Sequence, residues 1–154
     1  MITQTSTDLP LTTRTRVALA ISRGIAASMG HDDVTPAHVA LGLLLEGENP
    51  AVAALYNAGI AIRDVRREVE AALPPRGSPR PSEVAIPLTS GEEHVIAQAA
   101  AEARSMANEF IGPAHLLLAI LRDADTPAAQ AFARYGFYVD DGAAHLQVVL
   151  RGAS

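Results

Sequence analysis

Apolar residues recur along this chain every three or four positions, and no segment alternates strictly between apolar and polar residues. In the first periodic segment, Ala18 and Leu19 are followed by Ser22, Ala26 and Met29. This spacing places the side chains on one face of an α-helix. The pattern therefore predicts helices, and small residues dominate the face that the first helix buries.

The hydrophobic pattern occurs twice. Residues 11–73 and 88–150 align without a gap at an offset of 77 positions (88 − 11 = 77), and 17 of the 63 paired residues are identical. A unit of about 60 residues buries its apolar face poorly by itself, but it can bury that face against a copy. The duplication predicts an all-α fold: two four-helix repeats, related by a pseudo-twofold axis, packed as one eight-helix domain.

Capping residues mark the helix boundaries within each copy. Thr12 and Thr89 are placed to cap first helices that run to about Met29 and Met106, and Thr89-x-x-Glu92 has the pattern of a capping box. The later helices are predicted to begin at Pro36 and Pro113, to run from Pro50 to Gly59 and from Pro127 to Gly136, and to cover 62–73 and 141–150.

The bulk of the core is expected from the second helix of each copy. The large aliphatic residues there are Val39, Leu41, Leu43, Leu44, Leu116, Leu117, Ile120 and Leu121. Between the copies, residues 74–83 contain four prolines and one glycine, which predicts an extended linker. The predicted organisation is a polar leader 1–10, repeat one 11–73, a linker 74–87 with a short extended piece at Val84–Ile86, and repeat two 88–150.

Composition narrows the class of function. The net charge is −5, aromatic residues make up 4%, and no basic stripe occurs, so we expect no nucleic-acid partner. The chain has no cysteine, which removes disulfides and thiolate chemistry and suits the cytoplasm. No secretory signal and no apolar run of membrane-spanning length is present, so we expect no membrane partner. Nothing in the sequence predicts a cofactor or a metal.

Four segments carry a resemblance to a known family. Ala26–His31, Val34–Leu44 and Glu46–Asn49 in the first copy, and Phe110–Leu121 in the second, resemble the paired repeats of the Clp N-terminal domain. This is the double four-helix module in front of the AAA+ unfoldases ClpA, ClpB and ClpC. Each motif is weak by itself, but a matched pair in ungapped register is specific.

The resemblance implies binding rather than catalysis. In that family the module receives substrates and adaptor proteins and passes them to the ATP-driven ring. No Gly-x-x-x-x-Gly-Lys-Ser/Thr sequence occurs here, so this chain is not expected to hydrolyse ATP. Because Met1 and a polar leader precede the first repeat and the chain ends four residues after the last predicted helix, we expect a free-standing module.

One departure from the family concerns phosphoarginine. Family members that bind phosphorylated arginine carry a Thr and a Glu in each repeat, and the Glu precedes the repeated His. Thr12 and Thr89 match the Thr, but Ala37 and Ala114 stand at the Glu positions. Without these carboxylates the bidentate contact to a guanidinium is lost. We expect no phosphoarginine binding, and we keep Thr12 and Thr89 as candidate protein-binding residues.

The two copies differ along one helix stripe. Val17, Ile21 and Ile25 correspond to the polar residues His94, Gln98 and Glu102 of the second copy. A core position should be apolar in both copies, so this stripe is a candidate protein-binding site. Three alternatives are open: the seam between the repeats, a homodimer contact, or a groove for a client or adaptor.

The repeated His38 and His115 invite a metal or general-base hypothesis. No carboxylate or second histidine lies at ligand spacing on the same helix, so a structural role under the neighbouring helix is the preferred interpretation. His31, beside Asp32 and Asp33, is interpreted as part of a solvated turn. No catalytic residue is assigned, and we expect the protein not to be an enzyme.

Two classes of function follow. The first is a protein-binding module of the Clp system that binds clients, adaptors or ligands of an AAA+ unfoldase. The second is a helical scaffold or self-associating module that has lost Clp ligand binding, an alternative favoured by Ala37 and Ala114.

Overall fold

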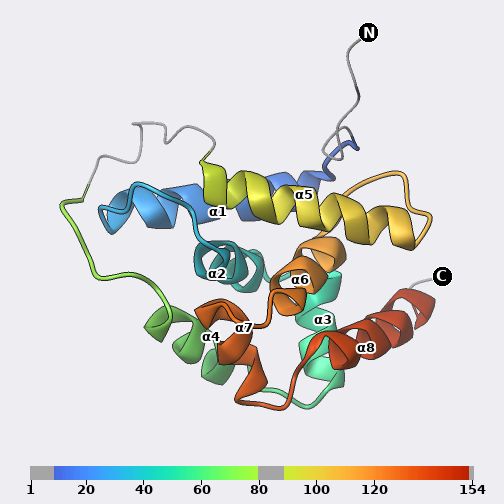
Figure 1. Cartoon of the computed structure of the whole chain (residues 1–154). Helices are drawn as coiled ribbons and strands as arrows, with labels where there is room; N and C mark the ends of the chain where they lie inside the picture. Colours follow the sequence, from blue (N-terminus) through green and yellow to red (C-terminus); the bar gives the residue numbers. More distant parts are fainter. Residues whose placement is uncertain (1–8, 80–88, 153–154) are drawn as a thin grey trace, which may run out of the picture.

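The computed structural model describes residues 9–79 and 89–152, which form eight α-helices (Figure 1). Repeat one contains α1 (Thr13–Ser28), α2 (Pro36–Glu46), α3 (Pro50–Asn57) and α4 (Ile62–Ala71), and repeat two contains α5 (Ser90–Ser105), α6 (Pro113–Arg122), α7 (Pro127–Ala133) and α8 (Val139–Gly152). The predicted all-α fold is confirmed. Val84–Ile86 and most of the leader lie outside the described residues.

The helix starts follow the capping residues. Thr12 Oγ1 accepts a hydrogen bond from the Thr15 N–H at 3.2 Å, and Thr89 Oγ1 accepts one from the Glu92 N–H at the same distance. The capping box predicted at Thr89 is only half formed, because the carboxylate of Glu92 binds Arg23 of α1 instead.

Several helix ends differ from the prediction by a few residues. α3 and α7 end at Asn57 and Ala133, before Gly59 and Gly136, and these glycines then reverse the chain at φ +78° and +70°. α8 begins at Val139, two residues earlier than expected. None of the helices in the described part of the chain is long and apolar enough to cross a membrane.

The core lies where the second helices of the two repeats meet. All eight large aliphatic residues predicted there on α2 and α6 are buried. α1 lies very close to α2, because a Cβ on Gly42 would stand 2.3 Å from the Ala18 carbonyl oxygen. The counterpart of Gly42 in repeat two is Ala119, so α5 and α6 leave room for a methyl group that α1 and α2 do not.

The outer helices of each repeat pack on the outer helices of the other repeat. Figure 1 shows α3 beside α8 at one corner and α4 beside α7 at the other, so that each third helix packs on the fourth helix of the other repeat. Each of these two helix pairs also has a polar contact, and the two contacts lie at corresponding positions of the repeats. Asn57 Nδ2 on α3 lies 2.7 Å from His145 Nδ1 on α8, and Arg134, directly after α7, pairs with Glu68 on α4 at 3.1 Å.

The start of the first helix of each repeat also contacts the other repeat. Leu11, just before α1, forms an isolated parallel bridge with Ile111 of repeat two, and the Thr15 hydroxyl donates to the Ile111 carbonyl at 2.9 Å. In return, Thr89 Oγ1 accepts from the Val34 N–H of repeat one at 3.2 Å. Each repeat therefore binds the turn before the second helix of the other.

One buried ion pair crosses this seam. Arg23 on α1 binds the fully buried carboxylate of Glu92 on α5 through two hydrogen bonds of 3.1 and 2.6 Å. A carboxylate removed from water is stable only while its partner stays in place.

We expect Gly42→Ala to destabilise the protein by about 2 kcal/mol, because overpacking pushes α1 and α2 apart. Denaturant unfolding measures this change. Gly24→Ala is the matched control, since a Cβ at Gly24 has nothing within 4 Å. It should stabilise α1 by roughly 0.5–1 kcal/mol. Equal stabilities of the two variants would contradict the close packing described above.

We expect Arg23→Ala to lower the free energy of unfolding by about 2 kcal/mol, because Glu92 is then buried without its cation. The exposed pair Arg66–Glu70, at 3.4 Å on α4, supplies the control. Arg66→Ala should cost at most about 0.5 kcal/mol. If both variants unfold at the same urea concentration, the seam pair is not a structural requirement.

Candidate functional site

The candidate stripe on α1 lies on the outside of the molecule. Val17 is 42% exposed, Ile21 is half-buried, and Ile25 packs against the edge of the core. The seam contacts of α1 come instead from Thr15 and Arg23, on other faces of the helix. Of the three alternatives for the stripe, the exposure of Val17 favours a homodimer contact or a client groove over the seam between the repeats.

A residue of α2 extends this apolar surface. Leu45 is 40% exposed and lies one turn after Gly42, the residue that touches α1. The next residue, Glu46, binds Arg14 of α1 at 2.6 Å, which places Leu45 beside the first half of α1. We call Val17, Ile21, Ile25 and Leu45 the α1–α2 outer surface.

Repeat two carries charged and polar groups at the same positions. The counterparts of Ile25 and Leu45 are Glu102 and Arg122, which form an ion pair between α5 and α6. Hydrogen bonding to Glu102 raises the pKa of Arg122. His94, the counterpart of Val17, lies 3.7 Å from Asp123. A hollow of about 300 Å³ in this region is lined by His94, Gln98, Ala119, Arg122 and Asp123.

The two outer surfaces thus share a backbone plan but differ in chemistry. Repeat two pairs Glu102 with Arg122 at these positions, whereas repeat one leaves the aliphatic side chains of Val17 and Leu45 partly exposed to water. Exposed aliphatic residues gathered on one face are typical of a surface that binds another polypeptide. Sequence analysis missed Leu45, although comparing it with Arg122 would have revealed the same asymmetry that singled out Val17.

The rim of the α1–α2 outer surface is already paired. Arg14 contacts Glu46, and Asn49 Nδ2 donates to the same carboxylate at 2.7 Å. Burial raises the pKa of Glu46, but the hydrogen bonds from Asn49 and Arg14 outweigh this effect and hold the pKa below its usual value. The rim is therefore charged but internally neutralised, so the apolar side chains dominate its chemistry.

The two candidate threonines have different surroundings from the stripe. Their hydroxyls cap α1 and α5, and both residues lie at the seam, where Thr12 N–H donates to the Ile111 carbonyl at 3.1 Å. Ala37 and Ala114, the two positions at which the family resemblance led us to expect no phosphoarginine contact, are buried. The five candidate residues therefore lie in two separate places, the outer surface of α1 for the stripe and the seam between the repeats for the two threonines.

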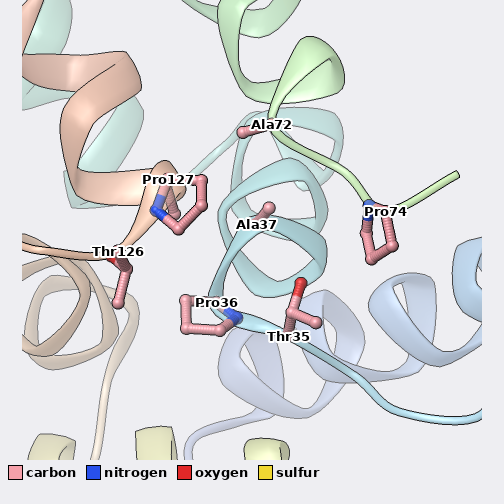
Figure 2. Close-up of a pocket in the computed structure, with 8 residues that line it drawn as sticks. Thr35, Pro36, Ala37, Ala72, Pro74, Thr126 and Pro127 are labelled. Atoms are coloured by element: carbon pink, nitrogen blue, oxygen red, sulfur yellow. The ribbon is translucent and has the colours of Figure 1, made fainter.

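A second hollow lies where the repeats meet. Figure 2 shows an apolar pocket between the starts of α2 and α7 and the segment that follows α4. Its volume is about 360 Å³, and its lining residues are Thr35, Pro36, Ala37, Ala72, Pro74, Thr126, Pro127 and Ala128. Nearly all of its lining is apolar, so it suits an aliphatic side chain rather than a charged group.

The repeated histidines are part of the helix starts. His38 Nδ1 accepts a hydrogen bond from the Thr35 N–H at 2.9 Å, and His115 Nδ1 accepts one from the Gly112 N–H at the same distance. Both rings are buried. Among the described residues no group of three or more His, Asp or Glu side chains is arranged to hold a metal ion. This geometry supports the structural interpretation.

Burial lowers the pKa of both histidines and so favours their neutral forms. Burial and the nearby His31 lower the pKa of His38 to about 4, against a smaller opposite effect of Asp33. Burial also lowers the pKa of His115, although Glu102 opposes it. The interpretation of His31 as part of a solvated turn is wrong, because its ring is buried and lies 2.8 Å from His38 Nε2.

Comparison with known proteins agrees with this architecture. The Clp repeat (R) N-terminal domain matches residues 10–135. The chain is 30% identical over 125 residues to the chaperone protein ClpB of Oceanobacillus iheyensis and, over the same length, to ClpC/MecB of Bacillus subtilis. These matches cover 81% of this chain but only 15% of each relative.

A solved structure shows the same fold. The N-terminal domain of Hsp104 from Candida albicans superimposes with a TM-score of 0.74, at 19% identity, over 94% of this chain and 93% of that domain. At this identity the likeness concerns the fold alone.

We expect the contribution of His38 to stability to depend on pH. In the unfolded chain His38 binds a proton below a pH of about 6.5. In the folded chain the pKa of His38 is about 4, so His38 binds a proton only below that pH. The folded state is therefore favoured above pH 6.5, and this advantage is lost as the pH falls from 6.5 towards 4.

Urea unfolding of the wild type and His38→Gln at several pH values measures this effect. The difference between their unfolding free energies should be largest near pH 7.5 and should shrink towards pH 4. Comparing the two proteins cancels the titration of the carboxylates, which they share. A difference that stays constant over this range would show that His38 titrates normally in the fold.

Proposed function

This chain belongs to the Clp repeat (R) N-terminal domain family, and we propose that it acts in the cytoplasm as a protein-binding module of a Clp chaperone or protease system. Its ligands would be clients or adaptors of an AAA+ unfoldase that present apolar residues. The match spans about 15% of the length of the curated ClpB and ClpC relatives. In this proposal it binds polypeptides without hydrolysing ATP and without catalysing a reaction.

One observation supports the proposal: the α1–α2 outer surface is apolar where its counterpart in repeat two is charged or polar. The positions share one fold, so folding does not require apolar residues there. Val17 and Leu45 are 42% and 40% exposed, and leaving aliphatic area in water has a cost of about 25 cal/mol per Å² that a bound polypeptide would recover. The apolar pocket of Figure 2 offers a separate place for one aliphatic side chain.

The alternative is a scaffold or self-associating module. Ala37 and Ala114 favour it, because these buried methyl groups cannot recognise a guanidinium. In that case the α1–α2 outer surface would bind a second copy of the chain rather than a client.

We expect the triple variant Val17→His/Ile21→Gln/Leu45→Arg to lose binding to an unfolded polypeptide by tenfold or more. The variant gives repeat one the residues that repeat two carries at the same positions, so it should stay folded. Reduced, carboxymethylated α-lactalbumin is a suitable unfolded probe, and fluorescence anisotropy measures its affinity. The single variant Ile21→Glu should weaken binding in the same direction.

Gln98→Glu, at the counterpart of Ile21 in repeat two, is the matched control and should bind as the wild type does. Sedimentation velocity separates the alternative function. A wild type that dimerises and ignores the probe, together with a monomeric triple variant, would support self-association. Unchanged probe binding by the triple variant would contradict a binding site on the α1–α2 outer surface.

A further inference from the structure

The apolar pocket of Figure 2 lies at the boundary between the repeats. Ala72 and Pro74, which follow α4, form one wall, and the starts of α2 and α7 form the others. Its volume of about 360 Å³ is near the lower end of the range for ligand pockets. The pocket therefore suits a small apolar group, and the second copy of the fold indicates how such a group is presented.

The linker leaves this pocket open. Beyond Pro74 the described part of the linker, residues 75–79, does not line it. The Pro75 carbonyl lies 2.9 Å from His31 Nε2. The Gly77 N–H donates to the Met29 carbonyl at 2.7 Å. Figure 1 shows this segment rising from α4 towards the end of α1. The linker is therefore docked on the turn between α1 and α2.

Glycine is required where the linker docks. Gly30, in the turn after α1, has φ +72°, and a Cβ there would lie 2.3 Å from the carbonyl carbon of Gly77. The counterpart of Gly30 in repeat two is Ala107, which has a left-handed conformation at φ +58° and carries a Cβ. A segment cannot dock on the turn of repeat two in the same way. The two repeats therefore continue differently after their fourth helices.

Repeat two continues as a helix where repeat one turns into the linker. α4 ends at Ala71, whereas α8 runs four residues past the matching Val148, to Gly152 (152 − 148 = 4). Val149 stands at the position of Ala72 and has two more carbon atoms. It is partly buried and packs against the core. The additional turn of α8 thus brings an aliphatic side chain to the place that corresponds to the pocket.

The residues around this place are more buried in repeat two than in repeat one. At the start of α6, Gly112 and Pro113 are buried. The matching residues of α2, Thr35 and Pro36, are half-buried. The proline that begins α3 is half-buried, whereas the one that begins α7 is exposed. The last turn of α8 accounts for this difference, because repeat one has no helix there.

The start of α2 also favours the end of a helix as its partner. Thr35, Pro36 and Ala37 line the pocket, and the first turn of α2 contains no acidic residue. The carboxylate that precedes it in sequence, Asp33, accepts a hydrogen bond from the Gly91 N–H of α5. The N-terminal end of a helix carries a partial positive charge, and the C-terminal end carries a partial negative charge. A helix that ends at the pocket is therefore complementary to it in charge.

We propose that this pocket binds an aliphatic side chain in the last turn of a helix of a partner polypeptide, as the matching place in repeat two holds Val149 of α8. The partner's helix supplies the turn that repeat one lacks. The inference rests on the protein-binding role proposed above and adds a second site to it. This site is separate from the α1–α2 outer surface, because the two have no residue in common.

Synthetic helical peptides test this proposal on the whole chain. The probe is an alanine-rich peptide of about 20 residues with Glu–Lys pairs four residues apart, which is long enough to form a helix in water. It has a leucine in its last turn. A second peptide has glutamine in place of this leucine, and a third has the leucine in its first turn instead. Fluorescence anisotropy of labelled peptides measures the affinity, and methyl shifts of ¹³C-labelled alanines locate the site.

The last-turn leucine peptide should shift the methyl signals of Ala37, Ala72 and Ala128, which line the pocket. The glutamine peptide should bind at least tenfold more weakly, because burial of a leucine side chain contributes about that factor or more. The first-turn leucine peptide should bind about threefold more weakly, because it brings the positive end of its helix to the start of α2.

Variants of the pocket provide the second half of the test. Ala72→Val copies Val149 and fills the pocket from within, so it should weaken binding of the last-turn leucine peptide at least tenfold. Ala144→Val is the matched control and should bind as the wild type does, because Ala144 is exposed on α8 and does not line the pocket.

Pro127→Glu replaces Ala72→Val if the latter does not fold. Pro127 is exposed at the first position of α7, where a carboxylate is favourable for the helix. A charge at the edge of the apolar pocket should reduce leucine binding at least tenfold, because the charge loses water when the peptide binds.

The two proposed sites are tested separately. The triple variant Val17→His/Ile21→Gln/Leu45→Arg should bind the last-turn leucine peptide as the wild type does, and Ala72→Val should keep its affinity for the unfolded probe. Loss of peptide binding in the triple variant would place the peptide on the α1–α2 outer surface. That result would overturn the pocket site and leave the proposed function intact.

Three other results would overturn the proposal: no shift of the three alanine methyl signals, equal affinities of the glutamine and last-turn leucine peptides, or unchanged peptide binding by both pocket variants. First-turn and last-turn leucine peptides that bind equally would contradict the preference for a helix end. A wild type that self-associates and becomes monomeric on Ala72→Val would assign the pocket to a second copy of the chain instead.

Discussion

Neither repeat buries its hydrophobic residues by itself. The packing of the two repeats against each other is the constraint on which the rest of the molecule depends. α3 packs on α8 and α7 packs on α4, and the turn before each second helix is bound by the start of the other repeat. A unit of about 60 residues buries only about 60% of the surface that its unfolded chain exposes, so its stability by itself is marginal. The copies therefore stabilise each other, and residues at the seam, such as Glu92, are committed to structure.

This commitment explains how one fold carries two different outer surfaces. Positions in the seam and core must stay compatible in both copies, but the outer faces of α1 and α5 are free to differ. Repeat two holds an ion pair between Glu102 and Arg122, where repeat one has Ile25 and Leu45. The duplication thus supplies an internal reference state: what is apolar and exposed in only one copy is not required by folding.

Much of this architecture could be predicted from local chemistry. Thr12 and Thr89 cap their helices as their side chains indicate, and the aliphatic residues of α2 and α6 are buried as their spacing requires. The side of α1 that meets repeat two could not be predicted, because periodicity does not say which flank of a helix carries the seam. The partners of Glu92 and His31 were missed for a related reason. They lie 69 and 44 residues away in sequence, and only the folded chain brings them together. The assignment of a binding role to Val17, Ile21 and Leu45 remains a proposal.

The pairing of α3 with α8 also has a consequence for biosynthesis. α3 is complete at Asn57, but the helix that covers it begins only at Val139. At elongation rates of about 5–20 residues per second, α3 stays exposed on the nascent chain for several seconds before α8 leaves the ribosome. Sequence-distant contacts of this kind also slow folding, because the intervening loop must be closed first. The first half of the chain therefore emerges as an unfinished hydrophobic surface, and stable folding must wait for the last helix to be translated.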